Sequence, residues 1–134
     1  MHNFKELKVW QKARVMVKDV YQTIGLFPED EKFGLVSQIR RASVSVPANI
    51  AEGAGRNTNA DFGRFLDIAN GSCFELETLL ILAVDLDYLS KSKYDIVFND
   101  IEEIQKMIYS LRNKIKNLDT HVSNLKSNKH ETKF

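Results

Sequence analysis

Four stretches of the chain carry apolar residues every three or four positions, the period of an amphipathic α-helix. None alternates apolar and polar residues as a half-buried strand would. The apolar stripes are Trp10, Ala13, Val17, Val20, Tyr21 and Ile24; Leu35, Ile39, Ala42, Val46 and Ile50; Phe62, Phe65, Leu66, Ala69, Cys73, Leu76, Leu80 and Ala83; and Tyr94, Val97, Ile101, Ile104, Ile108, Leu111, Ile115 and Leu118. Short connections make successive helices antiparallel neighbours. The sequence therefore predicts an all-α, antiparallel, up-down-up-down four-helix bundle.

Capping residues stand near the expected ends of the first and third helices. Asn3 with Glu6, and Thr58 with Asp61, have the spacing of a capping box, so we expect helices to begin there. Gly25 follows the first stripe, at the place where a left-handed residue commonly ends a helix.

The second helix is expected to begin at residues 29–31, because three acids directly after a proline suit the positive end of a helix. Pro47 lies inside this helix and removes a backbone hydrogen bond. The apolar stripe continues past Pro47, so we expect a kink rather than a break. Residues 53–55, Gly-Ala-Gly, are expected to end the helix, and the fourth helix opens near Ser92.

The fourth stripe, from Tyr94 to Leu118, alternates steps of three and four residues, which is a heptad seam. Residues beyond Leu118 include several poor helix formers, and order is expected to fade there. These features predict one four-helix-bundle domain at residues 1–118 and a basic, poorly ordered tail at residues 119–134.

The segment from Leu79 to Val84 is apolar all round, so it needs cover on more than one side. In a small bundle this extra cover is expected to come from another subunit. The interface residues that we predict are Val9, Trp10, Leu79, Ile81 and Leu82.

Charge is balanced overall but unevenly placed. The net charge is +1, which by itself does not indicate nucleic acid. Residues 75–103 hold eight acids against two bases, whereas residues 105–134 hold seven bases against two acids. A basic end is typical of an interaction tail or of a solvated helix end.

The chain lacks the signals of secretion or membrane insertion. Its beginning has no apolar signal segment, and its longest apolar run is far too short to span a bilayer. A single cysteine, Cys73, rules out an internal disulfide framework. We therefore expect a cytoplasmic protein.

No set of residues predicts a catalytic or metal site. The three histidines, His2, His121 and His130, lie near the ends of the chain, and no Glu-x-x-His motif of a di-metal bundle occurs. Cys73 falls on an apolar stripe, as a buried thiol does. Acids two positions apart lie on different helix faces. We expect no enzymatic activity, no cofactor, no metal and no small-molecule substrate.

Basic residues give the candidate binding site. Residues 53–58, Gly-Ala-Gly-Arg-Asn-Thr, resemble an anion-binding loop but also a plain helix end followed by a helix start. The candidate nucleic-acid-binding residues are Arg40, Arg41, Arg56, Arg64, Arg112, Lys114 and Lys116. Binding of phosphates by these residues would be strongly salt-dependent. The alternative is that the arginines pair with the acidic surface of the third and fourth helices, in the same or another chain.

Several segments together resemble one known family. They are residues 7–13 (LKVWQKA), Phe27-Pro28 with Glu31, the long run 38–53 (QIRRASVSVPANIAEG), and Phe65-Leu66 with Ala69, Gly71 and Ser72. Over residues 4–118 the chain resembles the four-helix-bundle proteins encoded in intervening sequences of bacterial 23S ribosomal RNA genes.

The resemblance implies a left-twisted four-helix bundle, assembled as a homopentamer, without enzymatic activity. The accessory proteins of diversity-generating retroelements are similar in fold and bind a reverse transcriptase and nucleic acid through basic surfaces. RNA or a ribonucleoprotein is therefore the expected partner, with a protein-protein interaction scaffold as the alternative. The near-neutral charge of this chain departs from those accessory proteins.

Overall fold

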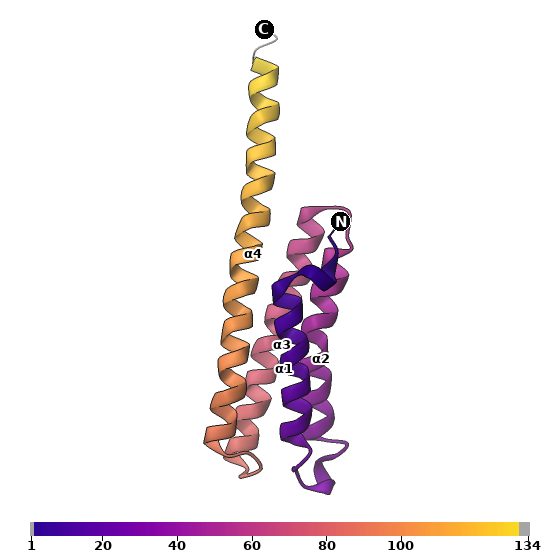
Figure 1. Ribbon diagram of the computed structural model, residues 1–134, viewed down its shortest axis with the longest axis vertical. Helices are drawn as coiled ribbons and strands as arrows, with labels where there is room; N and C mark the ends of the chain where they lie inside the picture. Colours follow the sequence, from indigo (N-terminus) through magenta and orange to yellow (C-terminus); the bar gives the residue numbers. More distant parts are fainter. Residues whose placement is uncertain (1, 132–134) are drawn as a thin grey trace.

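The computed structural model describes the backbone of residues 2–131 and the side chains of residues 2–119, 124 and 125. Its four α-helices are α1 (Lys8–Ile24), α2 (Leu35–Ala54), α3 (Asn59–Asp85) and α4 (Lys91–Glu131), with 3-10 turns η1 (Phe4–Glu6) and η2 (Glu29–Glu31). The helices lie side by side with alternating directions (Figure 1). Each packs against its neighbours in the chain, and α1 also packs against α4. The predicted antiparallel up-down-up-down bundle is confirmed, and residues 2–131 contain no strand.

The predicted stripes meet in a single core. In α3 every member of the stripe is buried except Phe65, which is half-buried. In α1 the buried face is turned slightly from the prediction: Val9 and Met16 are buried, whereas Trp10 is half-buried and Tyr21 is exposed. The reason is that α1 contacts both α2 and α4, so its apolar arc is wider than one stripe.

The heptad seam of α4 is buried from Val97 to Ile115, with Leu111 half-buried. Leu118, at its predicted end, is 57% exposed because it lies level with the beginning of α3. There Asn59 donates a hydrogen bond to Asp119 (2.9 Å). The backbone of α4 continues as a helix to Glu131, past the predicted domain boundary at 118, and rises beyond the other helices (Figure 1).

The helix ends agree with the predictions in part. Thr58 caps α3, and its hydroxyl oxygen accepts a hydrogen bond from the Asp61 amide (3.1 Å). Asn3 caps η1 rather than a long helix, and α1 begins only at Lys8. Gly25 follows the last residue of α1, as predicted, but the expected left-handed conformation was wrong, because its φ is −61°.

The boundaries of α2 and α4 also shift. Residues 29–31 form η2 instead of the first turn of α2. The Glu31 carboxylate nevertheless supports the start of α2, since it accepts a hydrogen bond from the Leu35 amide (3.0 Å). For α4 the capping residue is Ser90, whose hydroxyl oxygen accepts from the Lys93 amide (3.3 Å). In the preceding turn Asp87 has a positive φ of 62°.

Helix α2 passes through Pro47 without breaking, as predicted, and ends at Ala54. Its polar edge is bonded to α3 through Ser45, whose hydroxyl lies 2.8 Å from that of Ser72. The Asn49 amide donates to both the carbonyl (2.8 Å) and the hydroxyl (2.9 Å) of Ser45. This short hydrogen-bonded chain satisfies polar groups in a half-buried helix contact and fixes the register of α2 against α3.

Candidate nucleic-acid interface

The four arginines near the α2–α3 connection do not form one patch. Arg41 lies in α2, and Arg56 lies just beyond the end of α2. They are fifteen residues apart, which corresponds to roughly 22 Å along the helix axis. Arg40 lies five residues after the beginning of α2, where its guanidinium is 5.4 Å from the centre of the Tyr21 ring of α1. The rise of α2 therefore separates Arg40 and Arg41 from Arg56 and Arg64.

Most of the predicted binding arginines pair with acids of their own chain. Arg41 on α2 pairs with Glu75 on α3. Arg56 pairs with Glu52 at 2.9 Å, and Arg64 with Asp61 at 3.3 Å. These ion pairs are exposed, so each adds little stability, but they lower the local positive charge that a phosphate would meet. The sequence left open the alternative that the arginines pair with the acidic surface of α3. Arg41 makes such a pair.

Arg112 is held more firmly than the others. Its guanidinium donates two hydrogen bonds to the Asp67 carboxylate, at 3.1 and 3.2 Å. It lies directly over Gly63, where a methyl group would be 2.1 Å from its Nη1 atom. Gly63 thus makes room for a bidentate contact between α3 and α4, which gives Arg112 a role in helix packing.

The two predicted lysines of α4 are exposed and line shallow grooves. Lys114 borders a groove of about 330 Å³ between α1 and α4, with Leu7, Lys8 and Met107 among its walls. Lys116 borders a second groove of about 510 Å³ beside Asn59 at the beginning of α3.

The glycine-rich connection at residues 53–58 has the geometry of a helix end followed by a helix start. Gly53 is buried against the next helix, and Thr58 caps that helix. Besides its ion pair, the Arg56 guanidinium lies 4.7 Å from the centre of the Phe65 ring. The arginine of the loop is therefore occupied by groups of the same chain.

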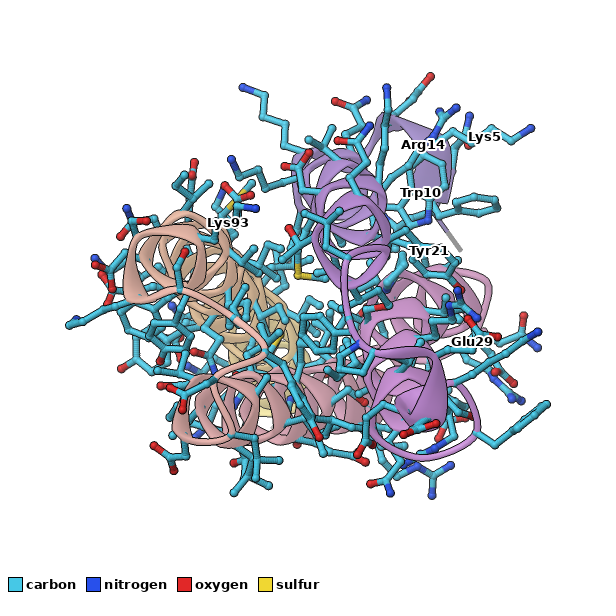
Figure 2. All side chains as sticks on the ribbon, turned by 90° about the horizontal axis from the view of Figure 1, so that it is seen from below. Lys5, Trp10, Arg14, Tyr21, Glu29 and Lys93 are labelled. Carbon is cyan, nitrogen blue, oxygen red and sulfur yellow. The ribbon has the colours of Figure 1, made fainter. Side chains whose placement is uncertain are left out.

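A basic and aromatic surface on α1 and α2 was missed in the sequence. The Arg14 guanidinium lies 5.7 Å from the centre of the Trp10 ring, which meets the Phe4 ring edge-on at 5.0 Å. The Lys5 ammonium lies 5.9 Å from the centre of the Phe4 ring. Figure 2 shows Lys5, Trp10, Arg14 and Tyr21 on one side of the molecule, away from Lys93 of α4. We call this surface, with Lys18 and Arg40, the α1–α2 face.

Bases outnumber acids on these two helices. Together α1 and α2 contain six bases and two acids, a net charge of +4. Asp19 interacts with Asp100 of α4 and also with the neighbouring Lys12 and Lys18, and Glu52 pairs with Arg56. No described acid lies within ion-pair distance of Lys5, Arg14, Lys18 or Arg40. The four-residue step from Trp10 to Arg14 was the signal available in the sequence, because it places both on one helix side.

In the contact between α1 and α4, a single base lies among several acids. The Lys12 ammonium lies 3.1 Å from Asp100 and 3.2 Å from Glu103, and its hydrogen bonds to these carboxylates raise its pKa. Burial raises the pKa of Asp19, and the neighbouring Asp100 raises it further. Lys12 is therefore engaged by two carboxylates of its own chain.

Of the remaining side chains that could react or bind a metal, Cys73 and His2 pack against other residues of the bundle. Cys73 is buried in the core as predicted, and burial raises the pKa of its thiol to about 12, so the thiolate is not formed at neutral pH. The His2 ring packs 5.2 Å from the Phe62 ring, whereas the side chains of His121 and His130 lie outside the described residues. Among the described residues no group of three or more His, Cys, Asp or Glu side chains is arranged to hold a metal ion.

The residues predicted for a subunit interface divide into two sets. Val9 and Leu79 are buried in the core of their own chain, which leaves them little surface for a partner. Ile81 and Leu82 are exposed on α3, and Trp10 is half-buried on the α1–α2 face. No helix in the described part of the chain is long and apolar enough to cross a membrane.

These features define a helical-bundle protein with its candidate chemistry on open helix faces. Over residues 5–110 the chain matches the 23S rRNA-intervening sequence proteins, and it belongs to that family. A similar solved structure is a protein of unknown function from the S23 ribosomal protein family of Bacteroides thetaiotaomicron. It is 31% identical, with a TM-score of 0.71, and the match covers 78% of this chain and 95% of that chain. A search of the curated proteins finds no match.

Proposed function

We propose that this chain is a non-enzymatic, oligomeric module that binds nucleic acid or a ribonucleoprotein in the cytoplasm. The observation that supports nucleic acid is the separation of charge between helices. The pair α1 and α2 carries six bases and two acids, whereas α3 carries one base and five acids. A surface rich in lysine and arginine attracts phosphates and gains free energy by releasing their counterions.

Membership of the family also supports nucleic acid as the ligand. The chain belongs to the 23S rRNA-intervening sequence proteins. The resemblance of its sequence to that family implies a fold similar to the accessory proteins of diversity-generating retroelements, which use basic surfaces. The net charge of this chain is only +1. Binding therefore depends on one face rather than on the whole surface, and it should weaken steeply with salt.

A filter-binding series tests the proposal. The full chain is titrated into an RNA that contains both helices and loops, at several salt concentrations from roughly 50 to 200 mM. The logarithm of the association constant is expected to fall linearly with the logarithm of the salt concentration, because phosphate contacts release counterions. Absence of binding at the lowest salt concentration would refute the proposal.

A protein-interaction scaffold is the second candidate, and exposed apolar side chains on α3 favour it. Phe74, Ile81 and Leu82 of α3 are 56%, 42% and 45% exposed, and Leu86, directly after the end of α3, is 54% exposed. Arg40→Ala and Arg41→Ala separate the two candidates. Loss of the oligomer on light scattering favours the scaffold, whereas an intact oligomer with lost RNA binding favours nucleic acid.

We further propose a homo-oligomer, a pentamer by family resemblance, with Ile81 and Leu82 at the subunit contact. Ile81→Glu is expected to shift sedimentation at micromolar concentration to smaller species, because a buried carboxylate without a partner opposes association. The matched control is Ile96→Glu, which places the same charge at an exposed isoleucine of α4. A wild-type monomer, or equal behaviour of the two variants, would contradict this assignment.

A further inference from the structure

The α1–α2 face has the two components that unpaired nucleotides require. Aromatic rings supply flat surfaces for bases, and cations beside them meet the phosphates. Trp10 and Tyr21 are eleven residues apart on α1, three helical turns or roughly 16 Å, with Arg14 and Lys18 between them. Tyr21 is 42% exposed, so its ring is accessible to a ligand.

The arginines of this face are positioned without using up their hydrogen-bond donors. Arg14 and Arg40 lie 5.7 and 5.4 Å from the ring centres of Trp10 and Tyr21. A guanidinium that contacts a ring through its flat side keeps its N–H groups available in its plane. Arg41, Arg56, Arg64 and Arg112 differ, because each of them already donates to a carboxylate.

The beginning of the chain closes one end of the face. The Gln11 side-chain amide donates to the Lys5 carbonyl (2.8 Å) and holds η1 against α1. The His2 amide donates to the Ala54 carbonyl (2.8 Å) and holds the same segment against α2. Phe4 and Lys5 are therefore fixed beside Trp10, and they extend the alternation of rings and cations beyond the first turn of α1.

We propose that the α1–α2 face binds single-stranded nucleic acid, with unpaired bases stacked on Trp10 and Tyr21 and phosphates bound by Lys5, Arg14, Lys18 and Arg40. This inference rests on the proposed function and specifies its ligand. A duplex keeps its bases stacked inside and offers mainly phosphates to such a face, so the rings would add nothing to duplex binding. Single strands present their bases, and stacking tolerates any sequence.

Trp10 is the only tryptophan of the chain, so it reports directly on its own surroundings. The full chain is titrated, at low salt, with a single-stranded RNA of about 16 nucleotides, its DNA counterpart, and a blunt-ended duplex of similar charge that has no loop. We expect the single strands to quench tryptophan fluorescence and the duplex to leave it nearly unchanged. Quenching by RNA alone would identify recognition of the sugar as a further element of the same site.

Matched variants test the two kinds of contact. Tyr21→Leu is expected to weaken single-strand binding about ten-fold, whereas Tyr21→Phe retains it, because only the ring stacks. The control is Tyr109→Leu, since Tyr109 is a 71% exposed tyrosine of α4 outside this face. Arg14→Gln and Arg40→Gln should each reduce the salt slope by about 0.7, and Arg64→Gln should leave it unchanged.

Four outcomes overturn the inference. If RNA binds but Trp10 fluorescence does not respond, or if Tyr21→Leu binds as tightly as Tyr109→Leu, the ligand lies elsewhere and the proposed function still stands. If Tyr21→Leu changes the oligomeric state on light scattering while Tyr109→Leu does not, the face is a subunit contact. If no nucleic acid binds at low salt, the inference and the proposed function fail together. Circular dichroism of each variant verifies that its helices are intact.

Discussion

Replacement of Ile104 by alanine is expected to lower the free energy of unfolding by about 2–5 kcal/mol. Ile104 is 0% exposed and lies in the middle of the heptad seam of α4, where it packs into the core of the bundle. The substitution removes three carbon atoms and leaves a cavity that the packed helices cannot fill without moving. Urea denaturation followed by circular dichroism measures the loss.

The control for this experiment is Ile96→Ala, which makes the same chemical change on the same helix. Ile96 is 63% exposed, so it contributes little buried area to the bundle. We expect its effect on the free energy of unfolding to stay within about 0.5 kcal/mol. Equal losses for Ile104→Ala and Ile96→Ala would show that the seam of α4 is not the core.

Replacement of Gly53 by alanine is expected to lower the free energy of unfolding by about 1–3 kcal/mol, although alanine normally favours helices. A methyl group at this position would lie 2.7 Å from the Cβ atom of Phe65 and 3.2 Å from the carbonyl oxygen of Phe62. Both are close to the backbone of α3, so they cannot move aside as a flexible side chain would. The last turn of α2 would have to separate from α3.

Gly71→Ala is the matched control, because Gly71 lies within α3 and a methyl group there meets nothing within 4 Å. This variant should be more stable by about 0.5–1 kcal/mol, as expected for glycine replaced by alanine inside a helix. The melting temperatures of the two variants are therefore expected to shift in opposite directions from that of the wild type. A stabilised Gly53→Ala variant would contradict the close contact between α2 and α3.

The charged residues illustrate how far composition can mislead about a site. Seven bases were selected because they cluster in sequence or near a glycine-rich loop, but the fold neutralises several of them. Arg41 meets Glu75, thirty-four residues away, and Arg112 meets Asp67, forty-five residues away. Only Arg40 belongs both to the predicted set and to the α1–α2 face.

The same reasoning applies to the predicted interface. The sequence identified Leu79–Val84 as apolar all round, but it did not show which residues of this run point inward. The fold buries Leu79, Leu80 and Ala83 and leaves Ile81 and Leu82 exposed. A helix in a bundle has two neighbours, so an apolar arc wider than one stripe is covered in part by a second helix of the same chain.

The helices, their antiparallel order and most of their buried residues could be predicted from the local pattern of residues. These follow from local rules: the period of apolar residues, the Thr58 cap, and connections too short for any other path. Local pattern could not predict which cations contact an acid and which contact an aromatic ring. That choice depends on residues far apart in the chain and on the rotation of each helix about its axis, which determines the direction of its side chains.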